Sequence, residues 1–121
     1  MSQALLPEPQ ANYGTLKNYV GGEWRESTGS LRDVVNPATG QVIARVPDST
    51  PQEVDEAVGI AREAFAEWRH VSAVKRTRPF FHLKHLLEEN KESLARSLVQ
   101  EMGKNIASAR GEMLRAMEEI E

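Results

Sequence analysis

The sequence predicts two small β-hairpins followed by about four α-helices. Two observations predict the hairpins: Gly21-Gly22 separates two short runs of strand-forming residues, and residues 36–40 (Asn-Pro-Ala-Thr-Gly) separate two longer runs. A third observation predicts the helices. From residue 51 onwards, apolar residues recur every three to four positions, which is the period of a helix with one buried face.

Each expected hairpin has the residues that its turn needs. Gly21 and Gly22 can both take a positive φ without steric cost, as a two-residue hairpin loop requires. In the second turn, Pro37 presets φ for the first corner and Asn36 can accept hydrogen bonds just before it. Gly40 can supply a left-handed residue at the end of that turn.

The first helix has a clear start. Thr50 and Glu53 have the spacing of a capping box, and Pro51 stands at the first helical position, where its missing N–H costs nothing. One apolar stripe then follows at helical spacing: Val54, Ala57, Val58, Ala61, Phe65 and Trp68. We therefore expect an amphipathic helix from residue 51 to about residue 68.

The helices after it are separated by polar or special residues. A second helix starts near Ser72, and Pro79 within it predicts either a kink or a start near residue 78. Asn90 is expected to end this run and to cap a third helix. Gly103 is expected to stop the third helix in a left-handed conformation.

A fourth helix is expected from Asn105, which is a favourable N-cap residue. Its apolar positions are Ile106, Ala109, Met113, Met117 and Ile120. This stripe is still running at Glu121, without a glycine, a proline or a basic last turn, so the pattern reaches the last residue unfinished.

Composition excludes several classes of function. The 121 residues contain 15 Lys and Arg against 18 Asp and Glu, a formal charge of −3, which does not favour a nucleic-acid partner. No apolar run is long enough for a bilayer, so no membrane partner is expected. Residues 1–15 are expected to be a flexible tail without the features of a signal peptide, which favours a cytoplasmic location. With no cysteine, the chain has no disulfide and no thiolate nucleophile.

The remaining candidates for chemistry favour structural interpretations. His82, His85 and Glu89 share a helix, but a metal site normally needs further firm ligands, so we interpret them as helix-surface residues. Residues 75–78 (Lys-Arg-Thr-Arg) are interpreted as a solvated or salt-bridged turn rather than a phosphate site. There is no glycine-rich phosphate loop and no carboxylate pair with a predictable pocket. From residue chemistry alone, nothing indicates catalysis.

Four blocks of the sequence carry a family resemblance. They read "NYVGGEWRES", "VVNPATGQVIARVPDST", "EVDEAVGIAREAFAEW" and "LVQEMGKNIASARGEMLRAMEEIE". In order and spacing they resemble the N-terminal segment of NAD(P)-dependent aldehyde dehydrogenases, over about residues 16 to 121. Within that family they look most like the CoA-acylating branch, the methylmalonate- or malonate-semialdehyde dehydrogenases.

The resemblance implies a long α/β enzyme with a Rossmann-type NAD domain, a catalytic domain and an oligomerisation arm. Residues 16–121 would be the incomplete N-terminal portion of the coenzyme-binding domain. A cysteine nucleophile would attack the aldehyde, a hydride would pass to NAD, and CoA would accept the acyl group in the acylating branch. None of the catalytic or NAD-binding residues maps onto this chain, so the 121 residues alone are expected to be inactive.

The resemblance also implies one candidate site and a set of partners. Some family members bind a monovalent cation near the positions that match Val34, Val35 and Glu101. The expected partners are the remainder of the dehydrogenase or further copies of it, with the aldehyde and CoA as substrates. Two alternatives stay open: a non-catalytic interaction module, and one half of a split dehydrogenase.

Overall fold

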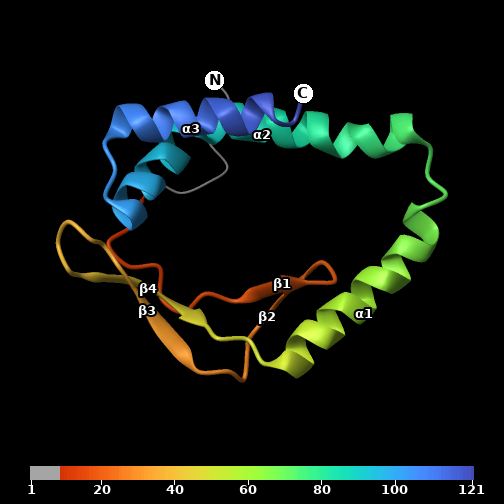
Figure 1. The fold of residues 1–121 in the computed structure, drawn as a ribbon, viewed down its shortest axis with the longest axis horizontal. Helices are drawn as coiled ribbons and strands as arrows, with labels where there is room; N and C mark the ends of the chain where they lie inside the picture. The colour runs from red at the N-terminus through yellow and green to blue at the C-terminus, as the bar shows by residue number, and fades with distance from the viewer. Residues whose placement is uncertain (1–8) are drawn as a thin grey trace.

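The computed structural model describes residues 9–121. Its elements follow in the order β1 (Asn18–Val20), β2 (Glu23–Arg25), β3 (Leu31–Val35), β4 (Val42–Pro47), α1 (Pro51–Trp68), α2 (Ala73–Met102) and α3 (Ile106–Glu118). Figure 1 shows the two hairpins on one side of the molecule and the antiparallel pair α2–α3 on the other. Helix α1 runs between the two sides and connects the hairpins to α2.

Both expected hairpins are confirmed. Strand β1 pairs antiparallel with β2, and the loop residues Gly21 and Gly22 have φ of +63° and +83°. Strand β3 pairs antiparallel with β4, with an irregularity between Val34 and Val35. In the turn between β3 and β4, the Asn36 side chain accepts a 2.9 Å hydrogen bond from the Ala38 N–H. A tight Asx turn therefore closes the second hairpin.

A segment before β1 adds to the second hairpin. The Tyr13 N–H donates to the Ile43 carbonyl at 2.7 Å, and the Arg45 N–H donates to the Gly14 carbonyl at 2.9 Å. Residues 13–16 thus run parallel to β4, on the edge opposite β3. Part of the segment expected as a flexible tail therefore makes backbone hydrogen bonds, while residues 1–8 of that tail lie outside the described residues.

Helix α1 begins where the capping box predicts. The Thr50 side chain accepts from the Glu53 N–H, the Glu53 side chain accepts from the Thr50 N–H, and Pro51 is the first helical residue. No residue of α1 is buried. Within its apolar stripe, Ala57 is half-buried and the other five residues are exposed.

The expectation of about four helices is wrong, because α2 is one helix of 30 residues and the chain has three helices within residues 9–121. Asn90 does not cap a new helix. It is only 3% exposed, and its side-chain amide donates to the Leu86 carbonyl one turn earlier at 2.8 Å. Pro79 neither starts nor ends the helix, although it removes the N–H that would have bonded the carbonyl of residue 75.

The end of α2 and the start of α3 lie where the sequence predicts them. Gly103 has a φ of +70° and donates its N–H to the Val99 carbonyl at 2.9 Å. The Asn105 side chain then accepts from the Ser108 N–H at 2.8 Å and caps α3. The core between α2 and α3 is built on small residues, since Ala95 and Ala109 are both fully buried there. Small side chains allow the two helices to approach closely.

Candidate functional site

The ends of β3 and α2 meet close to the candidate cation position. A Cβ built on Gly103 would lie 2.8 Å from Cγ of Pro37, so the turn after β3 packs directly on the C-terminus of α2. Val34 is half-buried, Val35 is exposed, and Glu101 is exposed at the last turn of α2. The packing brings the two segments into one region, but within residues 9–121 no hydrogen bond or ion pair joins Glu101 to Val34 or Val35.

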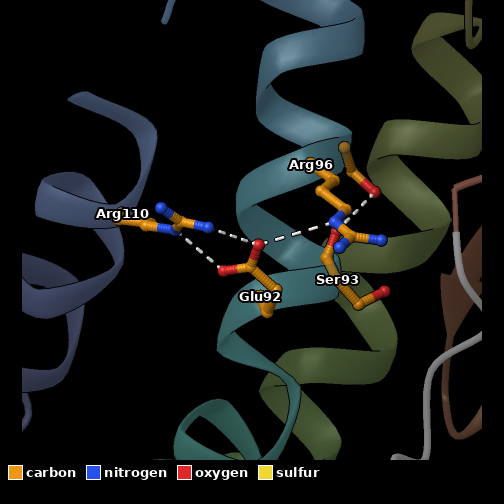
Figure 2. Close-up of polar contacts among 5 residues, drawn as sticks. Glu92, Ser93, Arg96 and Arg110 are labelled. Carbon is orange, nitrogen blue, oxygen red and sulfur yellow. Dashed lines mark hydrogen bonds and ion pairs between the residues drawn. The ribbon is translucent and has the colours of Figure 1, made fainter. Parts of the chain in front are cut away.

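Helices α2 and α3 are joined by a cluster of charged side chains that the sequence analysis missed (Figure 2). The Glu92 carboxylate on α2 accepts hydrogen bonds from Nε and Nη2 of Arg110 on α3, at 2.9 and 2.8 Å. Arg96, one turn further along α2, lies with its Nε 3.5 Å from the same carboxylate. Two guanidinium groups therefore face one carboxylate.

This arrangement shifts both protonation equilibria towards the charged forms. The hydrogen bonds from Arg110 lower the pKa of Glu92, and the charges of Arg110 and Arg96 add to that effect. The hydrogen bond to Glu92 raises the pKa of Arg110 in turn. The side chains of Glu92 and Arg110 are 43% and 55% exposed, so water screens the pair and limits its contribution to stability.

A second ion pair joins the α2–α3 loop to α3. Lys104 hydrogen-bonds to Glu112, and both side chains are largely shielded, at 19% and 34% exposure. The hydrogen bond from Lys104 lowers the pKa of Glu112, with a smaller effect from the charge of Lys104 itself. Together with the Asn105 cap, this pair fixes the direction in which α3 leaves the loop.

Glu53 is the most strongly perturbed carboxylate. Besides the capping-box bond from Thr50, it accepts from the Ser27 hydroxyl and from the Thr28 N–H, each at 2.7 Å. These bonds stabilise the ionised form and lower its pKa from an ordinary 4.5 to about 2, the Ser27 bond having the largest effect. Glu53 thus ties the loop between β2 and β3 to the start of α1.

Two of the three histidines, His82 and His85, lie on the surface of α2. His85 and His82 are exposed, and His85 Nε2 lies 3.5 Å from Glu89 Oε1 one turn away. Within residues 9–121, no three His, Cys, Asp or Glu side chains gather as metal ligands would. Among the helices of the same residues, none combines the length and apolar character that a bilayer crossing requires.

These charged clusters brace the fold, because the carboxylates of Glu53, Glu92 and Glu112 each accept hydrogen bonds from another segment of the chain.

The comparison with known proteins decides the family: the sequence profile of the aldehyde dehydrogenase family matches residues 24–121. The chain belongs to the aldehyde dehydrogenase family. It is 50% identical over 111 residues to malonate-semialdehyde dehydrogenase 2 of Bacillus mycoides, which covers 91% of this chain and 23% of that protein.

Solved structures of aldehyde dehydrogenases have the same fold over this segment. Aldehyde dehydrogenase C of Pseudomonas syringae, solved with NAD+ and octanal, is 37% identical with a TM-score of 0.83, over 87% of this chain and 22% of that one. A putative methylmalonate-semialdehyde dehydrogenase of Sinorhizobium meliloti, solved with NAD, is 31% identical with a TM-score of 0.82, over 88% and 22%. The aldehyde dehydrogenase chain described here therefore spans less than a quarter of the length of these relatives.

Proposed function

We propose that residues 16–121 are the N-terminal portion of the coenzyme-binding domain of an NAD-dependent, CoA-acylating aldehyde dehydrogenase. Its substrate is malonate semialdehyde or methylmalonate semialdehyde, and its product is an acyl-CoA. The observation that carries this proposal is the 50% identity over 111 residues to a malonate-semialdehyde dehydrogenase. The fold shared with a putative methylmalonate-semialdehyde dehydrogenase solved with NAD supports it.

The role of this chain in that reaction is structural. Oxidation of an aldehyde to a thioester needs a thiolate nucleophile and donors that stabilise the oxyanion, and this sequence has no cysteine. NAD, when bound, accepts the hydride. The residues of this chain supply a rigid brace instead: the α2–α3 pair with its two ion-paired contacts, and the Glu53 contacts that hold the strands to α1. The isolated chain is accordingly inactive.

A chimera tests this function. In the Bacillus mycoides malonate-semialdehyde dehydrogenase, the segment that matches this chain is replaced by the corresponding residues of this chain. We expect NAD reduction with malonate semialdehyde that depends on CoA, at a rate within about tenfold of the parent enzyme, since core swaps that keep volume and pattern are tolerated. A matched chimera with Ala109→Asp, a charge in the fully buried α2–α3 core, should be inactive.

Two outcomes would contradict the proposal. A chimera that assembles like the parent but oxidises no aldehyde would show that this segment does not serve a dehydrogenase of this branch. A chimera that loses only the acidic semialdehydes, while keeping simple aldehydes, would contradict the proposed substrate class.

We also propose that the carbonyl groups of Val34 and Val35 and the carboxylate of Glu101 hold a monovalent cation. Oxygen ligands of this kind suit hard cations, and the packing of Pro37 on Gly103 supports the proposal by bringing the two segments together. The melting temperature of the chimera should be higher in potassium or sodium chloride than in choline chloride. Glu101→Gln should remove this difference and Glu118→Gln should not; equal melting temperatures in all salts would contradict the site.

A further inference from the structure

A groove lies between α2 and α3 on the side of the Glu92 cluster. Its volume is about 260 Å³, and it is lined by Lys91, Glu92, Arg110, Met113, Leu114 and Met117. Ligand sites for drug-sized molecules are commonly of about 300–1,000 Å³. The groove is slightly smaller than these sites, so it has room for a ligand that is smaller than a drug-sized molecule.

The floor of the groove is apolar and adaptable. Met113 and Met117 are 8% and 7% exposed and belong to the face that α3 turns towards α2. Leu114 beside them is 54% exposed, which leaves an apolar side chain in contact with water at the groove. Methionine side chains are unbranched and polarisable, so they adjust to the shape of an apolar ligand.

The rim of the groove is positively charged. Arg110 and Arg96 approach the Glu92 carboxylate from two sides, as Figure 2 shows, so the only carboxylate that lines the groove is already compensated. Lys91 is exposed and makes no ion pair with the residues that the structure describes. Two cationic residues, Lys91 and Arg110, and one carboxylate, that of Glu92, line the groove, which leaves a net positive charge over an apolar floor.

We propose that this groove binds a small amphipathic carboxylate. The apolar body of the ligand lies on Leu114 and the two methionines, and its carboxylate lies against Lys91 with Arg110 on the other side. Charge complementarity selects the anion, and the limited volume selects a short chain. This site lies apart from the candidate cation position and is independent of the proposed dehydrogenase activity.

The test is a calorimetric titration with straight-chain monocarboxylates of four, six and eight carbons. It is run on the 121-residue chain and on the active chimera. We expect the dissociation constant to fall about fourfold for each added methylene group until the groove is filled. Lys91→Met should weaken binding about two- to fivefold, and Leu114→Trp, which fills the groove, should weaken it more than about tenfold. Lys75→Met, near the start of the same helix, is the matched control and should leave the dissociation constant unchanged.

Methyl NMR of the 121-residue chain locates the ligand. The resonances of Met113 and Met117 should shift during the titration, and that of Met102, outside the groove, should stay in place. Binding that is indifferent to Lys91→Met and Leu114→Trp would overturn the proposal. So would binding to the isolated chain that is lost in the chimera, since the groove would then be covered by another part of the dehydrogenase.

Discussion

Glu53 joins two elements through one carboxylate. A capping box accounts for its contact with Thr50, but the bonds from Ser27 and Thr28 come from a loop about 25 residues earlier. Together these hydrogen bonds lower the pKa of the Glu53 carboxyl to about 2. Sequence spacing predicted the local contact and could not predict the distant one, because nothing in the spacing says where the loop will lie.

The shifted pKa of Glu53 predicts how stability depends on pH. A carboxyl whose pKa is lowered in the folded state contributes stability that is fully present above its ordinary pKa of 4.5 and is lost as pH falls towards 2. Glu53→Gln should therefore lower the melting temperature at pH 7, and the gap to the parent should shrink between about pH 5 and pH 3. Melting followed by circular dichroism at several pH values checks this. A gap that stays constant over that range would contradict it.

Gly103 is required for two separable reasons. Its φ of +70° disfavours any side chain, and a Cβ there would meet the Pro37 ring at 2.8 Å. Gly40 is a matched control, because it has nearly the same φ, +72°, with nothing within 4 Å of its built Cβ. We expect Gly40→Ala to cost about 1–2 kcal/mol from backbone strain alone.

Gly103→Ala should cost about 1–3 kcal/mol more than Gly40→Ala, because the Pro37 contact adds overpacking. Urea unfolding of the two variants measures this difference. Equal losses in the two variants would mean that the turn after β3 does not press on the end of α2.

The starts of the helices differ in how they are capped. The Asn105 side chain accepts from the Ser108 N–H at 2.8 Å, whereas Ser72, before α2, makes no side-chain capping bond. Asn105→Ala should therefore destabilise the chain by about 1 kcal/mol. Ser72→Ala should change its stability by less than about 0.5 kcal/mol. Urea unfolding compares the two, and a larger loss for Ser72→Ala would contradict the assignment.

At the scale of elements, local signals predicted starts and turns well and helix continuity poorly. Thr50, Asn105 and Gly103 act within one turn of themselves, so their roles can be predicted from neighbours in sequence. Asn90 has the same chemistry as a cap, but it is buried at 3% exposure inside α2 and bonds to the Leu86 carbonyl. Its burial in the folded chain outweighs its weak helix propensity.

At the scale of the whole molecule, the distant contacts are those that no sequence pattern predicted. Residues 13–16 pair with β4 across about 30 positions, and Glu92 meets Arg110 across 18. The candidate cation residues were named from the family resemblance and not from a sequence pattern. The approach of Pro37 to Gly103, which relates their two segments in space, is likewise a contact between distant positions.

The arrangement of the elements leaves α1 without cover in the described residues. No residue of α1 is buried, and Val54, Phe65 and Trp68 are each more than 40% exposed. In Figure 1 the helix runs from the hairpins to α2. Apolar faces of this kind mark interaction surfaces, which agrees with a bracing segment that packs on the remainder of a dehydrogenase.

The central claim is that this chain braces an aldehyde dehydrogenase without holding its coenzyme. A tryptophan-fluorescence titration with NAD tests it most directly, because Trp24 and Trp68 report from the strands and from α1. We predict no saturable response from the 121-residue chain and a saturable response from the chimera under the same conditions. Saturable NAD binding by the isolated, cooperatively folded chain would contradict the claim, since a complete nucleotide site would then lie within these residues.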